Sequence, residues 1–122
     1  MTMRRTLLAA TVALFGLSGF ADAPQRYVVT YSVTVAGVEQ ASGQVLMVEN
    51  GDARVERSDD EGGYAFNATL YPIDEGLMLK TDLWRGATKI AEPALEMAKG
   101  GQARMALDGD QQRIVIEIVP AD

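Results

Sequence analysis

The acidic triplet Asp59-Asp60-Glu61 is the densest group of side chains in this sequence that could bind a metal ion or take part in catalysis. Carboxylate oxygens are the ligands that Ca²⁺ prefers, but the ion needs several of them arranged around it. Three consecutive residues point in different directions, and the alternating spacing of a calcium-binding loop is missing. Gly62-Gly63 follows directly. We therefore interpret the triplet as a solvated turn, and Asp108-Gly109-Asp110 in the same way.

Histidine and cysteine are both absent from the chain. Their absence excludes thiolate nucleophiles, imidazole bases, Ser-His-Asp triads and the usual zinc and copper sites. Glu92, Glu96, Asp74 and Glu75 could serve glycoside hydrolysis if two of them were held about 5–9 Å apart, but no pattern in the sequence brings two together. We therefore predict a protein that is not an enzyme, with no catalytic residue, no metal site and no cofactor. A carboxylate-based hydrolase is an alternative for which no acid can be nominated.

Aromatic side chains are the remaining candidates for recognition, because their rings suit ligand grooves and interfaces. Trp84 is the only tryptophan and lies beside Arg85 at the end of an alternating stretch. Tyr31, Phe66 and Trp84 are the candidate ligand or interface aromatics. The alternative is that they are aromatic residues of the core or its rim.

Strands must position these side chains, because alternation with a period of two dominates the sequence. Residues 25–36 place large apolar side chains at the odd positions from Tyr27 to Val35. Residues 64–71 and 77–84 alternate in the same way, with Lys80 and Asp82 on the polar face of the second stretch. These three stretches are predicted to be half-buried strands.

Turn signals separate the predicted strands. Asn50-Gly51 is the strongest short-range signal for a hairpin turn, and residues 72–76 and Asp108-Gly109 are further turns. Residues 53–58, with Val55 among charged neighbours, predict a short edge strand that discourages aggregation.

The segment 92–101 is open to two interpretations. Pro93 at the start and glycine after Lys99 are helix start and stop signals. A helix there would have only two turns, and such helices are marginal. The alternation of Leu95 and Met97 with Glu96 predicts a strand instead. With either outcome the chain is all-β, a single antiparallel β-sandwich or small barrel of eight or nine short strands.

The N-terminal residues have the layout of a secretory signal peptide. Arg4 and Arg5 precede an apolar run of 14 residues, Leu7 to Phe20, which is shorter than the roughly 20 residues that span a bilayer. Small residues follow, as at a cleavage site. We predict a signal peptide at 1–21, with cleavage after Ala23 as the alternative, and a single β domain at 22–122. The protein is then periplasmic or secreted, with no membrane span after removal of the leader.

The charge of the chain limits its partners. The formal net charge is −6, and loss of Arg4 and Arg5 with the leader leaves nine basic and 17 acidic residues, or −8. Such a surface repels nucleic-acid phosphates and anionic headgroups, so neither is an expected partner. No cysteine is present to form a disulfide. The domain must therefore be held together by its core.

The last third of the chain resembles a strand–turn–strand stretch of bacterial secretins. In residues 90–120, Pro93 precedes an apolar strand, Gly100-Gly101 leads to Ala103, and a final apolar strand runs from Ile114 to Pro120. The chain departs from that family in being too short for a secretin gate and in lacking stacked N-terminal domains. The resemblance implies strands in this region and a setting in the cell envelope.

These observations predict a non-catalytic exported protein that acts as a binding or structural accessory module of the cell envelope. The expected partner is another envelope protein, because exposed strand edges offer backbone pairing; the oligomeric state is left open. The alternative from another class is a small barrel that binds an apolar ligand. Its cavity would be lined by Tyr31, Phe66, Leu79 and Trp84.

Overall fold

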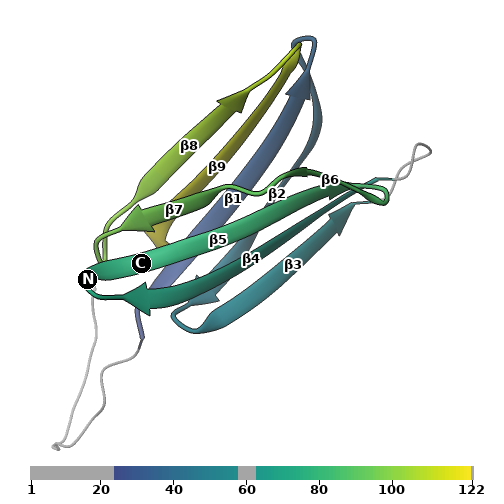
Figure 1. Ribbon diagram of the computed structural model, residues 1–122. Coiled ribbons are helices and arrows are strands. Elements are labelled where there is room, and N and C mark those ends of the chain that lie inside the picture. Colours follow the sequence, from purple (N-terminus) through teal and green to yellow (C-terminus); the bar gives the residue numbers. More distant parts are fainter. Residues whose placement is uncertain (1–23, 58–62, 122) are drawn as a thin grey trace, which may run out of the picture.

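The computed structural model describes residues 24–57 and 63–121. The predicted signal peptide and the acidic triplet Asp59-Asp60-Glu61 lie outside these residues. The prediction of an all-β fold is confirmed: nine strands form two antiparallel sheets that pack face to face (Figure 1). None of the described residues belongs to a helix long and apolar enough to span a lipid bilayer.

One sheet, here called the β1 sheet, has the order β2-β1-β9-β8, and the other, the β5 sheet, has the order β3-β4-β5-β6. The short strand β7 also pairs with β5, and β6 and β7 follow one another along the same side of β5 (Figure 1). The strands are β1 (Arg26–Val35), β2 (Val38–Val48), β3 (Gly51–Arg57), β4 (Tyr64–Ile73), β5 (Gly76–Arg85), β6 (Thr88–Ala91), β7 (Ala94–Met97), β8 (Ala103–Asp108) and β9 (Gln112–Ala121).

The chain runs up and down around the molecule, so that most strands lie beside their neighbours in sequence. It changes sheet twice, from β2 to β3 and from β7 to β8, and neither of these pairs is hydrogen-bonded as a ladder in the described part of the chain. The last strand, β9, pairs with the first, β1. The result is a sandwich rather than a closed barrel, which decides between the two architectures predicted from the sequence.

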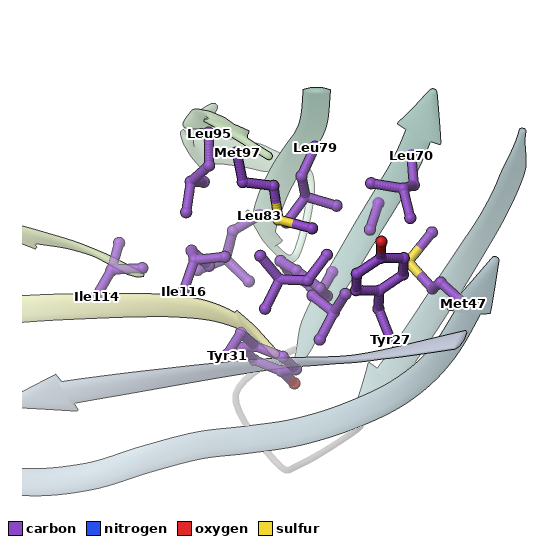
Figure 2. Packing of buried hydrophobic residues seen from close by; sticks show 14 of the residues in the cluster. Tyr27, Tyr31, Met47, Leu70, Leu79, Leu83, Leu95, Met97, Ile114 and Ile116 are labelled. Carbon is purple, nitrogen blue, oxygen red and sulfur yellow. The ribbon is translucent and has the colours of Figure 1, made fainter. Parts of the chain in front are cut away.

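A single apolar core fills the space between the sheets. Alternate residues of the long strands point inward, as the period-two pattern predicts, and Figure 2 shows their side chains meeting between the ribbons. Burial of each large apolar side chain contributes about 1.5–3 kcal/mol. The buried hydrophobic residues are Tyr27, Val29, Tyr31, Val33, Ala41, Met47, Tyr64, Phe66, Ala68, Leu70, Leu77, Leu79, Leu83, Leu95, Met97, Ile114, Ile116 and Ile118.

The turn at Asn50-Gly51 is present, but the hairpin predicted around it is wrong. Asn50 has a positive φ of 65°, as expected for a turn. Its backbone N–H, however, donates to the carbonyl of Leu70 at 2.7 Å, so the chain has already joined β4 of the other sheet. β2 pairs with β1 and β3 pairs with β4. A turn signal fixes the local backbone and leaves open which strand becomes the partner.

Within the segment 92–101, Ala94–Met97 form strand β7, so the predicted strand is confirmed and the alternative, a short helix near 93–99, is wrong. Leu95 and Met97 of β7 reach the core, being only 4% and 8% exposed. The same two residues pair with Leu79 and Leu77 of β5. Burial of two side chains on one face of a short edge strand outweighs the weak stability of a two-turn helix.

Candidate functional site

The outer face of the β5 sheet carries a row of polar side chains. Leu79 and Leu83 of β5 point into the core, which places Asp82 on the opposite, outer face. Across the ladder, Asp82 lies opposite Asn67 of β4, and Asn67 lies opposite Arg54 of β3. Antiparallel pairing therefore aligns three polar residues that are distant in sequence.

Hydrogen bonds connect this row. Arg54 Nη1 donates to Asn67 Oδ1 at 3.0 Å, and Asn67 Nδ2 donates to Asp82 Oδ1 at 2.6 Å. The indole Nε1 of Trp84, two residues along β5, donates to the same Asp82 Oδ1 at 2.9 Å. Arg54 also pairs with Glu56. The amide of Asn67 is thus held from both sides, and the row Arg54–Asn67–Asp82–Trp84 is here called the polar ridge.

The edge of the sheet is interrupted beside this ridge. β6 ends where Ala91 pairs with Leu83, and β7 begins where Ala94 pairs with Lys80. Pro93 lies in the gap, where the lack of an N–H prevents it from donating to the ladder. Asp82 is therefore left without a residue opposite it on this side.

Thr81 fixes the interruption from the core side. Its side chain is 4% exposed, and it is the one polar residue among the buried residues that the structure describes. Both its backbone N–H, at 3.0 Å, and its Oγ1, at 2.9 Å, donate to the carbonyl of Pro93. A buried hydroxyl must be hydrogen-bonded to avoid a large desolvation cost. The position of Pro93 is thus set by two bonds from a residue of the core.

Two clefts lie on either side of the Asn67–Asp82 pair of the polar ridge and share these two residues. The first, here the Pro93 cleft, has a volume of about 540 Å³; the second, the Trp84 cleft, about 490 Å³. Both volumes fall within the range of about 300–1,000 Å³ that is usual for small-molecule sites. The Pro93 cleft is lined by Asn67, Thr69, Lys80, Thr81, Asp82, Glu92, Pro93 and Ala94, and the Trp84 cleft by Arg54, Ala65, Asn67, Asp82, Trp84, Gly86 and Ala87.

The charges around the clefts are closely balanced. Lys89 donates from Nζ to Glu92 Oε2 at 2.8 Å, and its ammonium lies 5.6 Å from the ring centroid of Trp84. The hydrogen bond to Glu92 raises the pKa of Lys89 above its usual value, which keeps this side chain charged. Lys80 has no ion-pair or hydrogen-bond partner from its side chain within residues 24–57 and 63–121. Two lysines thus accompany the two carboxylates of Asp82 and Glu92.

The three aromatic residues singled out in the sequence do not share a surface. Tyr31 and Phe66 stack on each other in the core, with ring centroids 4.7 Å apart and an interplanar angle of 17°. Leu79 is also fully buried. Trp84 is half-buried and lies on the outer face of the β5 sheet. Only Trp84 is therefore in a position to touch a ligand at these two clefts. Tyr31 and Phe66 are core residues, as in the alternative interpretation of the sequence, and a recognition role for Trp84 stays a prediction.

The hydroxyl of Tyr31 is unusual within this core. It is buried and makes no hydrogen bond in the part of the chain that the structure describes. Burial raises the pKa of Tyr31, while the positive charge of Arg57 acts in the opposite direction. The ring of Tyr31 packs closely against Gly43 of β2. A Cβ atom added at Gly43 would lie only 2.9 Å from the nearest ring carbon.

Of the four carboxylates considered for hydrolysis, only Glu92 lines a cleft, and it meets there the carboxylate of Asp82, which the sequence did not single out. No group of three or more acidic side chains among the described residues is placed to hold a metal ion. The one signal for Asn67 and Asp82 in the sequence is that both are polar residues at outward positions of alternating strands.

No known family, curated protein or solved structure matches the chain, so the secretin-like stretch 90–120 stays a prediction.

Proposed function

We propose that the protein is a non-catalytic binding module of the cell envelope, and that its binding site is the polar ridge with its two clefts. The observation that carries this proposal is the hydrogen-bonded arrangement of Arg54, Asn67, Asp82 and Trp84 on three neighbouring strands. Strands are rigid supports, and polar groups already held in place lose little conformational entropy when a partner binds. Pre-organisation of this kind supports recognition.

The composition of the chain supports binding without catalysis. Neither imidazole nor thiol is available, so a reaction would depend on carboxylates and lysines. In the Pro93 cleft, Asp82 accepts hydrogen bonds from Asn67 and Trp84, and Glu92 accepts one from Lys89. Asp82 is thus held as an acceptor between two neighbouring side chains, and Glu92 is paired with one lysine at the surface.

The cellular location belongs to the same proposal and rests on the N-terminal residues. The cationic start at Arg4 and Arg5, the apolar run and the small residues after it support export. Fractionation of cells that express the full chain with a C-terminal tag would test this. Cleaved protein in the periplasm or medium is expected, and full-length protein retained in the cytoplasm would contradict it.

Capture from envelope extract tests the binding proposal. The tagged full chain, exported and processed by the cell, should retain a specific envelope component, whereas a double variant with Asn67→Ala and Asp82→Asn should lose it. Ser32→Ala, on the outer face of the β1 sheet, is the matched control and should retain it. Equal capture by the double variant, or no capture by the unmodified protein at any salt concentration, would refute the proposed site.

A further inference from the structure

We infer that the two clefts bind a neutral saccharide chain, which lies across the Asn67–Asp82 pair of the polar ridge with one sugar unit on each side. This inference rests on the proposed binding function and names the class of ligand. Because the clefts share Asn67 and Asp82, a ligand that fills both must pass over these two residues. A chain of linked rings suits such a pair of adjoining clefts.

The polar groups in the Pro93 cleft match a ligand that both donates and accepts hydrogen bonds. Asp82 is an acceptor and Lys80 a donor, while Asn67 and the hydroxyl of Thr69 can do both. A ligand that covers one of these groups without forming a hydrogen bond to it removes the water from that group, and the lost hydration is not compensated. A sugar hydroxyl donates and accepts at the same atom, so a saccharide can satisfy all of these groups.

The balance of charge favours a neutral ligand. Lys80, Asp82 and Glu92 line the Pro93 cleft, and Lys89, which is not part of the lining, neutralises Glu92 by pairing with it. Arg54 lines the Trp84 cleft and is paired with Glu56 outside that lining. An anionic ligand would meet Asp82 at the centre of the site, and a cationic one would meet Lys80. The negative charge of the whole chain also disfavours phosphate-rich partners.

The Trp84 cleft adds an apolar wall. Ala65 lies opposite Trp84 in the ladder, and Gly86 and Ala87 line the same cleft. Such small side chains leave room beside the half-buried indole, while Lys89 occupies part of its surroundings at 5.6 Å from the ring centroid. The C–H face of a sugar ring can pack on the remaining exposed part of the indole, since aromatic rings combine an apolar body with a polar N–H.

An extended peptide is less well suited to this site. Peptides that bind to sheets usually add a strand to a free edge, where backbone groups supply the affinity. The edge beside the Pro93 cleft is interrupted between Ala91 and Ala94, and its proline has no N–H to offer. The polar ridge lies instead on the face of the sheet, where side chains are the only partners.

Titration with neutral oligosaccharides tests this inference. Maltohexaose, cellohexaose and chitohexaose would be added to the processed protein, with binding followed by calorimetry and by the emission of Trp84, which is the only tryptophan. At least one of the three should bind and change the emission. Thr69→Val and Asp82→Asn, which preserve side-chain shape, should each weaken binding tenfold or more, and Ser32→Ala should leave it unchanged.

Three outcomes would overturn the inference. They are the absence of binding by all three oligosaccharides up to about 10 mM, binding that both cleft variants leave unchanged, and binding of charged glycans or peptides alone. If capture from envelope extract still depends on Asn67 and Asp82 while no oligosaccharide binds, the ligand class is wrong and the binding site stands. If capture is equal in all variants, the proposed binding site itself is wrong, and if the unmodified protein captures nothing, the proposed binding function fails.

Discussion

The outer faces of the two sheets differ, although both sheets contribute to one core. On the β5 sheet, side chains of three strands are hydrogen-bonded across the ladder and two clefts adjoin them. On the β1 sheet, a hollow of about 430 Å³ is lined by Thr30, Tyr31, Ser32, Ser42, Gly43, Gln44, Arg104, Val115 and Glu117. Thr30 and Ser32 make no side-chain hydrogen bond within the described residues. In the part of the chain that the structure describes, the polar side chains of this face are therefore not joined into a hydrogen-bonded row like the polar ridge.

This difference separates stability from recognition. Exposed hydrogen bonds and ion pairs contribute little to the free energy of folding, typically 0–1 kcal/mol for an ion pair on the surface. Within the described residues, the outer face of the β1 sheet has a cross-strand ion pair, Arg113–Asp108, but no hydrogen-bonded row over three strands. The polar ridge of the β5 sheet is thus expected to contribute little to the free energy of folding, which agrees with the binding role proposed for it, whereas the hydrogen bonds from the buried Thr81 to Pro93 are expected to stabilise the fold.

The largest effect on stability is expected from Gly76→Ala in the β5 sheet. A Cβ at Gly76 would overlap the carbonyl oxygen of Met97 in β7, and backbone atoms cannot move aside without disturbing the edge of the sheet. We expect a loss of about 3 kcal/mol in the free energy of unfolding, at the upper end of the usual cost of overpacking. Urea denaturation of the purified variant measures it.

Gly43→Ala in the β1 sheet is the matched control for that variant. Its new Cβ would lie 2.9 Å from a ring carbon of Tyr31 and 3.2 Å from Cγ1 of Val55. Both are side-chain atoms, and although the ring of Tyr31 is held by its stacking on Phe66, the backbone need not move, so the loss should be smaller, about 1–2 kcal/mol. Equal losses of unfolding free energy at the two positions would show that the backbone of β7 moves aside as easily as a side chain does.

The next effect concerns the interruption of the sheet edge at Pro93, between β6 and β7. Thr81→Val keeps the shape of the side chain but removes the hydrogen bond from Oγ1 to Pro93, so we expect the free energy of unfolding to fall by about 1–2 kcal/mol. The variant should also weaken ligand binding, because Pro93 and Glu92 line the cleft. Thr30→Val on the outer face of the β1 sheet makes the same chemical change and should stay within about 0.5 kcal/mol of the unmodified protein. A neutral result for Thr81→Val would mean that the gap is held by other contacts.

The inner faces of both sheets could be predicted from the sequence, because alternation alone determines which side chains are buried. Tyr27 to Val35 of β1 and the isoleucines of β9 point inward as expected. The outward position of Asp82 was predicted for the same reason. These predictions needed no knowledge of which strands are neighbours.

The polar ridge could not be predicted from the sequence, because it depends on the register in which β3, β4 and β5 pair. The sequence indicates a turn at 72–76, whereas the paired strands end at Ile73 and resume at Gly76. A shift of one residue in that turn would pair Asn67 with Thr81, which faces the core, instead of Asp82. The part played by Arg54 depends in addition on the pairing of β3 with β4, and Asn50-Gly51 had indicated pairing of β3 with β2.

Two tyrosines of β1 allow a smaller and more local comparison. The hydroxyl of Tyr27 accepts a hydrogen bond from the backbone N–H of Gly100 at 2.8 Å, whereas that of Tyr31 is buried and unpaired within the described residues. Tyr27→Phe should therefore lower the free energy of unfolding by about 1 kcal/mol. Tyr31→Phe should leave it unchanged or raise it by up to about 1 kcal/mol, since it removes an unsatisfied polar group. Thermal and urea denaturation at pH 7 measure both, and a loss in Tyr31→Phe would reveal a partner for its hydroxyl.

The smallest expected effect is the alkaline pH dependence that Tyr31 adds. Burial raises its pKa in the folded state, while in the unfolded chain the phenol ionises near pH 10. As the pH rises above about 10, the unfolded chain loses this proton and the folded protein keeps it, so the free energy of unfolding falls until the pH passes the raised pKa of the folded state. Near pH 10.5 the contribution is less than about 1 kcal/mol. Urea denaturation from pH 7 to 11 should therefore give a steeper decline for the unmodified protein than for Tyr31→Phe, with parallel curves below pH 9. Identical slopes above pH 10 would show that the phenol titrates alike in both states and that its burial has no electrostatic consequence.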